Sequence, residues 1–494
     1  MPNKDSFNKM VLLTFVKVFG IVFAFIIPMY LGRTLAIETY GTYKQVMLFF
    51  WFSQVALNLG VDDSAYFYLR RDSKNFPLYS FNAMIFNLVA MGLFWLILVI
   101  FNIQIAKLIN NASLAEYLPV LGYLILSTVA SMQLEGILIG LNRFKERLML
   151  EMGMEIIKSL AILVGFVFFN SIMVVLYLLS TIMTLRLIAT LNIIHNYKKA
   201  GQLHYKDAFP HFKAQLKFGL PLGLSRILQN ILNLENLFVS SFFSIIQYTI
   251  YAVGCFENPL INAARVSLFE LANIELVDAM KHNDFVKALQ IWRSLTRKLF
   301  LIIIPFVTYI MFFAYEIIVL VFSDKYIASV PFFIVFNIYI LVGALNPEPL
   351  FRATLKTHMA LRIRTAGVIA GLILIVVGAY YLGPIYALIG KIIGIFTINI
   401  TGLIIGAGFI KARFKDLFNW KELIHVTLLS LVLTIPLRLL FSNLSWHPFW
   451  ILAASFSIYL SLHFLVSCYT KLIKDDEIEH LKSAFLKIKA KINL

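Results

Sequence analysis

Residues 79–101 read YSFNAMIFNLVAMGLFWLILVIF, a run without a single charged side chain. A transmembrane helix needs about 20 consecutive apolar residues to cross a hydrocarbon core of about 30 Å. This run is long enough, so it predicts a helix that spans a membrane. Runs of the same kind recur along the rest of the chain.

The composition of the whole chain agrees with this interpretation. Of the 494 residues, 60% are hydrophobic and 14% are charged, whereas soluble domains are about 45–50% apolar and about 25% charged. The composition excludes an ordinary soluble globular protein and predicts an all-α polytopic membrane protein with about 14 transmembrane helices. We expect the spans near residues 10–31, 46–61, 79–101, 117–140, 152–170, 173–194, 218–243, 246–268, 299–322, 331–350, 365–382, 385–410, 424–441 and 449–470.

The positive charges predict the orientation of these spans. Lys and Arg accumulate in the short cytoplasmic loops of membrane proteins, and with the N-terminus inside, most of the 43 basic residues fall in inner segments. The outer loops then hold only Arg33, Lys44, Lys107 and Lys325. We therefore expect both termini in the cytoplasm, and we interpret the net charge of +17 as a topology signal rather than a sign of nucleic-acid binding.

A short internal repeat predicts how the spans are grouped. The stretch IETYGTY at 37–43 returns as IIQYTIY at 245–251, at a constant offset of 208 residues. Six predicted spans separate the copies, so both run in the same direction, as in transporters built from parallel repeats around a central cavity. The predicted domains are an N-terminal six-helix lobe at 1–194, a cytoplasmic linker at 195–217, a C-terminal six-helix lobe at 218–410, two additional helices at 411–470 and a tail at 471–494.

The tail is predicted to bind anionic membrane lipid. Five apolar residues share one helical face and several lysines surround it, which is typical of a helix that lies on the inner leaflet. The apolar residues are Ile478, Leu481, Phe485, Ile488 and Ile492. A solvated tail is the alternative interpretation.

Several motifs point to a known family. They are LGRTL at 31–35, ETYGTY at 38–43, LNLG at 57–60 followed by YLRR at 68–71, and FGLPL at 218–222. With these motifs the chain resembles, over roughly residues 10–410, the polysaccharide-export branch of the multidrug/oligosaccharidyl-lipid/polysaccharide (MOP) flippase superfamily.

The resemblance implies a function. Members of this branch carry undecaprenyl-pyrophosphate-linked oligosaccharides from the inner to the outer leaflet of the bacterial cytoplasmic (inner) membrane, for O-antigen, capsule or related polymers. It also implies two six-helix lobes with a central cavity and two additional C-terminal helices, alternating access between the lobes, no cofactor, and the polymerase and other polysaccharide-assembly proteins as partners.

Four cations lie deep in predicted spans: Lys17, Lys158, Arg226 and Lys391. An ionisable side chain at membrane depth usually faces a wet cavity or a partner, and Lys and Arg bind phosphate oxygens by charge-assisted hydrogen bonds. We predict that these four bind the pyrophosphate and sugars of the substrate, with Arg226 the strongest candidate.

The other three cations also have interpretations that involve no substrate. Lys17 could extend to the inner surface, Lys158 could simply neutralise Glu155 on its own helix, and Lys391 lies among glycines that favour close helix packing. Arg186, Arg265 and Arg438 lie nearer span ends, where we expect their side chains to reach toward the interface.

Three acids fall within predicted spans of the C-terminal half: Glu235, Glu257 and Glu316. They are candidate coupling acids, because a buried carboxylate can take up a proton; a static partner for Arg226 or Arg265 is the alternative. Pro347 and Pro349 bound a break near a predicted helix end. They are a candidate gate hinge, because proline removes a backbone donor and kinks a helix, or only a helix terminus.

The chain carries no recognisable enzyme signature. Gly390-Lys391-Ile392 lacks the other elements of a phosphate-binding loop, and no histidine spacing suits a metal. We therefore expect neither a catalytic residue nor a metal site. Two rival functions stay open: a drug/cation antiporter of the same superfamily, and a membrane polysaccharide polymerase or ligase, which would usually carry a large outer loop with catalytic Arg or His.

Overall fold

The computed structural model describes residues 20, 22–23, 25–57, 59–71, 75–140, 143–199 and 208–473. All regular elements in this part of the chain are helices, which confirms the prediction of an all-α protein. Nine helical stretches among these residues are long and apolar enough to cross a membrane, so the chain is a multi-pass membrane protein. The total of about 14 crossings stays a prediction. Lys17 and the amphipathic tail lie outside the described residues.

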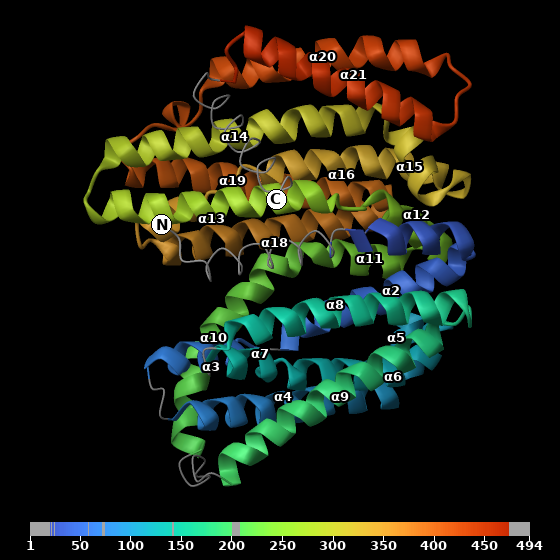
Figure 1. Ribbon diagram of the computed structural model, residues 1–494, viewed down its shortest axis with the longest axis vertical. Coiled ribbons are helices and arrows are strands. Elements are labelled where there is room, and N and C mark those ends of the chain that lie inside the picture. The colour runs from blue at the N-terminus through green and yellow to red at the C-terminus, as the bar shows by residue number, and fades with distance from the viewer. Residues whose placement is uncertain are drawn as a thin grey trace, which may run out of the picture. The chain divides into compact units, whose positions relative to one another are not determined.

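The chain divides into two compact units, and the first comprises Met1–Ala252 and Arg364–Lys391. Its helices are α2 (Ile37–Leu57), α3 (Val61–Arg71), α4 (Phe76–Ile100), α5 (Asn102–Leu108), α6 (Leu114–Ser131), α7 (Gln133–Gly140), α8 (Phe144–Val167), α9 (Ile172–Lys199), α10 (Ala208–Asn230), the 3-10 helix η3 (Ile231–Leu234), α11 (Glu235–Phe242) and most of α12 (Ile245–Gly254). Helix α6 packs against both α4 and α9, and α8 packs on α9 (Figure 1).

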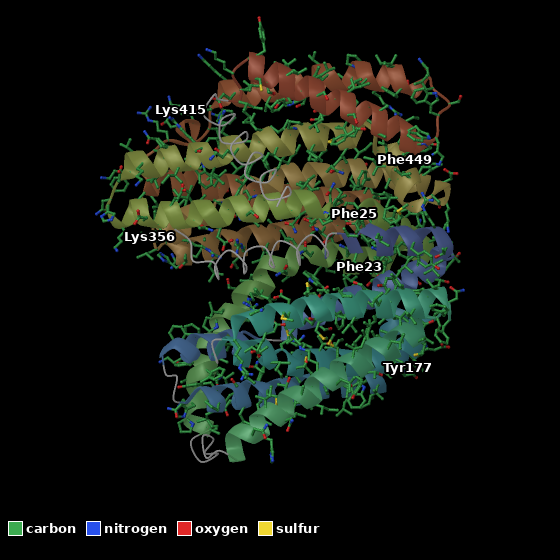
Figure 2. The ribbon with its side chains drawn as sticks, viewed as in Figure 1. Phe23, Phe25, Tyr177, Lys356, Lys415 and Phe449 are labelled. Atoms are coloured by element: carbon green, nitrogen blue, oxygen red, sulfur yellow. The ribbon has the colours of Figure 1, made fainter. Side chains whose placement is uncertain are left out.

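The second unit comprises Val253–Ile363 and Ile392–Leu494. Helix α14 packs against α13, α16 and α20, and α20 packs against α21. Lys356 and Lys415 lie toward one end of these helices and Phe449 toward the other (Figure 2). The placement of both lysines in inner segments stays a prediction. The helices are α13 (Pro259–Lys281), α14 (Phe285–Phe312), α15 (Ala314–Phe322), the 3-10 helix η4 (Asp324–Ser329), α16 (Val330–Gly343), α17 (Glu348–Ala353), the 3-10 helix η5 (Phe414–Leu417), α20 (Trp420–Ser442) and α21 (Pro448–Tyr469).

Besides α12, two longer helices are divided between the units. Helices α18 (Thr357–Leu382) and α19 (Pro384–Phe409) form a hairpin whose segment 364–391 groups with the first unit. They pack closely, because Gly378 and Gly390 lack side chains where the backbones of Tyr386 and Ile375 approach. The predicted domain boundaries at 194, 217 and 410 differ from this division and stay a proposal.

The internal repeat is visible in the helices themselves. Helix α2 begins at Ile37 and α12 begins at Ile245, which is the same offset of 208 residues as in the sequence repeat. The two copies also touch: Thr249 Oγ1 donates a hydrogen bond to the carbonyl oxygen of Ile37 at 3.2 Å. A Cβ atom at Gly41 would collide with Thr249 Oγ1, so glycine allows this close approach.

Several boundaries differ from the prediction. The second span was expected to begin at residue 46, but α2 already begins at Ile37 and contains Glu38 and Lys44. Residues 208–217 of the expected linker form the start of α10. This segment is held to α4, because Gln215 Nε2 donates to the carbonyl oxygen of Tyr79 at 3.0 Å.

Two of the family motifs meet in the structure. Gly60, whose φ of 73° is easily adopted only by glycine, ends the turn between α2 and α3. A Cβ at Gly219 of the FGLPL motif would lie 2.6 Å from the carbonyl oxygen of Gly60. The two glycines therefore permit α10 to contact the turn at backbone distance.

Candidate functional site

The first unit contains a cavity of about 350 Å³ lined by Gly20, Phe23, Ile27 and Pro28 and by residues of helices α2, α6, α8 and α9. Its walls are mostly apolar, and its ionisable side chains include Glu155 and Lys158 of α8. Predicted site residue Lys158 thus borders a cavity. Its ammonium group forms an ion pair with the Glu155 carboxylate, and the two side chains remain 33% and 55% exposed. The predicted neutralising pair is present, and it lies at the cavity wall.

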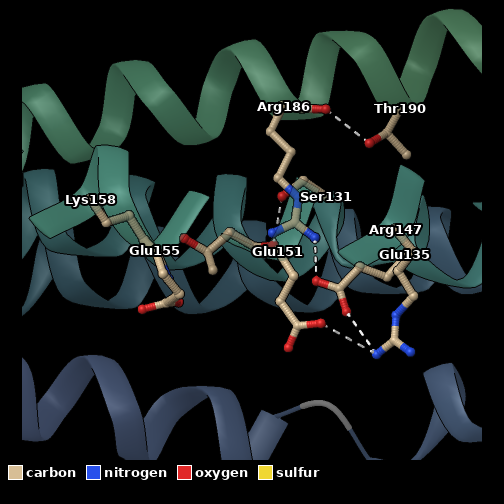
Figure 3. A network of polar contacts seen from close by, with 9 residues as sticks. Ser131, Glu135, Arg147, Glu151, Glu155, Lys158, Arg186 and Thr190 are labelled. Carbon is tan, nitrogen blue, oxygen red and sulfur yellow. Dashed lines mark hydrogen bonds and ion pairs between the residues drawn. The ribbon is translucent and has the colours of Figure 1, made fainter. Parts of the chain in front are cut away.

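A second set of charges continues along α8 from this pair (Figure 3). Glu135 of α7 accepts a hydrogen bond from Arg186 Nη2 of α9 at 2.9 Å and lies 3.8 Å from Arg147 Nη2 of α8. Arg147 also lies 3.9 Å from Glu151, one turn further along α8. Three helices are therefore joined by alternating charges.

Arg186 is largely buried. Its side chain is 10% exposed and pairs with Glu135, and its expected reach toward the interface stays a prediction. Sequence spacing does not show this pairing, because the two residues lie on different helices, 51 positions apart.

Lys391 and Glu235 form a buried ion pair. Lys391 Nζ of α19 donates to Glu235 Oε1 of α11 at 2.7 Å, and the side chains are 4% and 0% exposed. Asn236 Nδ2 donates to the same oxygen at 2.8 Å, whereas the buried Oε2 has no hydrogen-bond partner. The structure thus brings together a cation predicted for substrate binding and an acid predicted for coupling.

This pair lies at a break in a predicted span. The span at 218–243 consists of α10, η3 and α11, so the backbone tightens into a 3-10 turn immediately before Glu235. A 3-10 stretch inside a helix often marks a hinge.

Arg226 is exposed on α10. Its carbonyl oxygen accepts a hydrogen bond from Asn230 Nδ2 at 3.0 Å. The residue lies one turn before the break, within the same helix as Pro221. Arg226 remains the predicted cation that is most accessible to a ligand among those that the structure describes.

The remaining predicted acids differ from one another. Glu257 is exposed in the segment between α12 and α13, which interrupts the predicted span at 246–268. Glu316 of α15 is 5% exposed and pairs with Arg438 of α20. The cation of that pair is neither Arg226 nor Arg265, the partners that the sequence suggested. Arg265 Nη2 donates instead to Asn262 Oδ1 at 2.9 Å.

Pro347 and Pro349 lie at the start of α17, with Pro347 in the N-cap position. Gly402 and Gly406 of α19 pack against this short helix, since a Cβ at Gly402 would meet Pro347 at 2.5 Å and one at Gly406 would meet Leu350 at 3.1 Å. The prolines therefore mark a helix terminus, and their role as a hinge stays a proposal.

A buried polar cluster was missed by sequence reasoning. Asp62 at the start of α3 accepts a hydrogen bond from Asn87 Nδ2 of α4 at 3.0 Å and another from Gln133 Nε2 of α7. A signal was available, because Asn87 is a polar residue inside a predicted span and Asp62 lies two positions after the LNLG motif.

The sequence matches the family described as polysaccharide biosynthesis protein over residues 6–259. The chain belongs to this family. The match covers the N-terminal half and the start of the second repeat, which includes α2, α8, α10 and the break before Glu235.

Solved structures show which fold this family member adopts. It is similar to the lipid II flippase MurJ in an inward closed conformation, with 14% identity, a TM-score of 0.68 and coverage of 93% of this chain and 99% of that one. It is also similar to an inward-facing multidrug resistance MATE family transporter of the MOP superfamily, with 16% identity, a TM-score of 0.59 and coverage of 80% and 95%.

A third match is a mutant form of the Vibrio cholerae MATE transporter VcmN, with 14% identity, a TM-score of 0.53 and coverage of 81% and 96%. The fold is therefore that of the MOP superfamily, as the sequence motifs implied. No curated protein matches the sequence.

Proposed function

We propose that this family member is a flippase that moves undecaprenyl-pyrophosphate-linked oligosaccharide from the inner to the outer leaflet of the bacterial cytoplasmic membrane. Membership of the polysaccharide biosynthesis protein family carries the proposal. The fold shared with a lipid II flippase over 93% of the chain supports it, because lipid II is itself a lipid-linked saccharide. The product would supply cell-surface polysaccharide such as O-antigen or capsule, and polymerase and other assembly proteins are the expected partners.

The charges suggest how the substrate is bound. Lys158 and Lys391 are each paired with a carboxylate, so they add little net positive charge for an anion. Arg226, exposed on α10, and Lys17 are the proposed pyrophosphate ligands, since Arg and Lys bind phosphate oxygens by charge-assisted hydrogen bonds.

The proposed cycle is alternating access between the lobes at 1–194 and 218–410, with both termini in the cytoplasm. An inside-negative potential favours outward movement of the anionic substrate by about 2.3 kcal/mol per charge per 100 mV. Glu235, Glu257 and Glu316 are the proposed candidates for coupling to an ion.

Translocation in proteoliposomes tests this function. Lipid-linked oligosaccharide labelled with a fluorophore is placed in both leaflets, and an impermeant reductant reports which molecules reach the outer side. We expect Arg226→Ala to slow translocation at least tenfold, Arg226→Lys to retain part of it, and Lys213→Ala, an exposed cation on the same helix, to have no effect. Absence of translocation by the wild type would overturn the function, and normal transport by Arg226→Ala would remove the site.

A drug/cation antiporter is the second candidate, favoured by the similarity to a MATE fold. The same vesicles loaded with ethidium distinguish it: cation-dependent ethidium movement without movement of lipid-linked sugar would support the antiporter. A polymerase or ligase would instead lengthen or transfer the saccharide.

A further inference from the structure

One face of α8 carries a row of charges through the first unit. We name Arg147, Glu151, Glu155 and Lys158 the α8 ladder. Their spacing of three or four positions places them on one helix face, and they extend over about 16 Å at 1.5 Å per residue. Figure 3 shows them in sequence along the helix.

The deeper half of the ladder borders the cavity of the first unit. The side chains of Arg147, Glu151, Glu155 and Lys158 are 25%, 45%, 55% and 33% exposed, and the last two lie within the predicted span at 152–170. An ionised carboxylate that faced hydrocarbon there would be strongly unfavourable, so such residues normally face a wet cavity. Glu155 and Lys158 do line the cavity of about 350 Å³. The ladder thus begins near the N-terminal end of α8, which is its predicted inner end, and ends at this cavity.

The charges of this region compensate one another. Glu155 pairs with Lys158, Glu151 with Arg147, and neighbouring Glu135 with Arg186. A surface with balanced charge attracts a diphosphate only weakly. It nevertheless presents many strong donors and acceptors, and hydrogen bonds to ionised groups are about twice as strong as those between neutral groups.

The ligand that fits such a surface is uncharged and rich in hydroxyl groups. A hydroxyl both donates and accepts, so sugar hydroxyls can donate to Glu151 and Glu155 while they accept from Arg147 and Lys158. We infer that the α8 ladder binds the saccharide part of the lipid-linked substrate and guides it from the inner end of α8 into the cavity. This inference rests on the proposed function, and it reassigns Lys158 from pyrophosphate to sugar.

The test compares two probes in the proteoliposome assay. One is undecaprenyl pyrophosphate, and the other is the same lipid bearing a neutral pentasaccharide. Both carry the same fluorophore near the pyrophosphate. The test variant Glu155→Gln with Lys158→Met removes the deepest pair of the ladder without leaving a lone charge. The matched control is Arg143→Met with Glu146→Gln, another pair three positions apart at the start of the same helix. These side chains are 57% and 55% exposed and lie outside the predicted span.

We expect the test variant to translocate the pentasaccharide probe roughly ten times more slowly than the wild type. It should translocate the sugar-free probe at the wild-type rate, and that result also shows that the variant folds. The control should move both probes normally. The charge-reversed variant Glu155→Lys with Lys158→Glu keeps every donor and acceptor type, so it should recover most transport of the sugar-bearing probe.

The opposite results separate the hypotheses. Equal slowing of both probes, or no slowing of either, would overturn the ladder as a saccharide site while the flippase function stands. A wild type that moves the sugar-free probe alone would also overturn it. A wild type that moves neither probe would overturn the proposed function, and with it this inference.

Discussion

Gly41 and Thr249 occupy the same position in the two sequence repeats, and they lie against each other where α2 meets α12. Gln45 Nε2 of α2 also donates to Ser240 Oγ of α11 at 2.8 Å. The repeated segments at 37–43 and 245–251 therefore meet at equivalent positions.

This contact predicts the effect of a single methyl group. Gly41→Ala should lower the stability by about 1–3 kcal/mol, because the new Cβ collides with Thr249 Oγ1 in a packed site. Gly153→Ala, on α8 with no neighbouring atom within 4 Å of the new Cβ, should instead be neutral or stabilising by up to about 1 kcal/mol. Thermal unfolding in detergent measures both. Thr249→Ala should restore part of the loss in Gly41→Ala, and equal behaviour of the two alanine variants would contradict the contact.

The buried pair Lys391–Glu235 predicts strongly non-additive mutations. Glu235→Gln or Lys391→Met alone should destabilise the protein by about 3–5 kcal/mol, because each leaves one charge buried without its partner. The double variant should recover most of this loss. Arg143→Met, which breaks an exposed pair, should cost less than about 1 kcal/mol. If Lys391→Met impairs transport without any loss of stability, Lys391 acts mainly on the substrate.

Variants of Glu316 and Arg438 can show whether Glu316 couples transport to an ion or only neutralises Arg438. Glu316 is 5% exposed and pairs with Arg438 of α20, so Glu316→Gln should weaken the attachment of α20 by about 1–3 kcal/mol. As a static partner, Glu316 becomes dispensable once Arg438→Met is added, and the double variant should transport at the wild-type rate. Loss of transport in a stable double variant would instead assign Glu316 to coupling.

Glu135 predicts a cooperative effect on three helices. Glu135→Gln should lower the stability by about 1–3 kcal/mol. The side chain of Arg186, which is only 10% exposed, would lose its carboxylate partner, and Arg147 would keep Glu151 but lose its ion pair with Glu135. Glu146→Gln, in an exposed pair on α8, serves as the control and should change the melting temperature little. A similar change for both variants would show that the Glu135 network adds no stability.

Local patterns predicted the elements well. The division between the fifth and sixth spans was expected at Asn170-Ser171, and α8 ends at Val167 while α9 begins at Ile172. Asn170 adopts a φ of 45° there, a conformation that asparagine tolerates. The equal helix starts at Ile37 and Ile245 likewise follow from the repeat.

The partners of the buried charges could not be predicted in the same way. Glu155 and Lys158 are three positions apart, so their pairing follows from helix geometry. Lys391 and Glu235 meet only because α19 packs beside α11, and no local pattern encodes that approach. The predicted roles of single charges in substrate binding or coupling therefore depended on tertiary contacts that the sequence does not display.

The grouping of residues 364–391 with the first unit has a consequence for biosynthesis. Glu235 and Lys391 are 156 positions apart, so at about 5–20 residues per second the ribosome needs roughly ten to thirty seconds to supply the lysine after the glutamate. During this interval the nascent chain holds the Glu235 carboxylate without its counter-ion. The first unit is thus completed late in translation, because it takes up residues 364–391 only after the segment at 253–363 has been made.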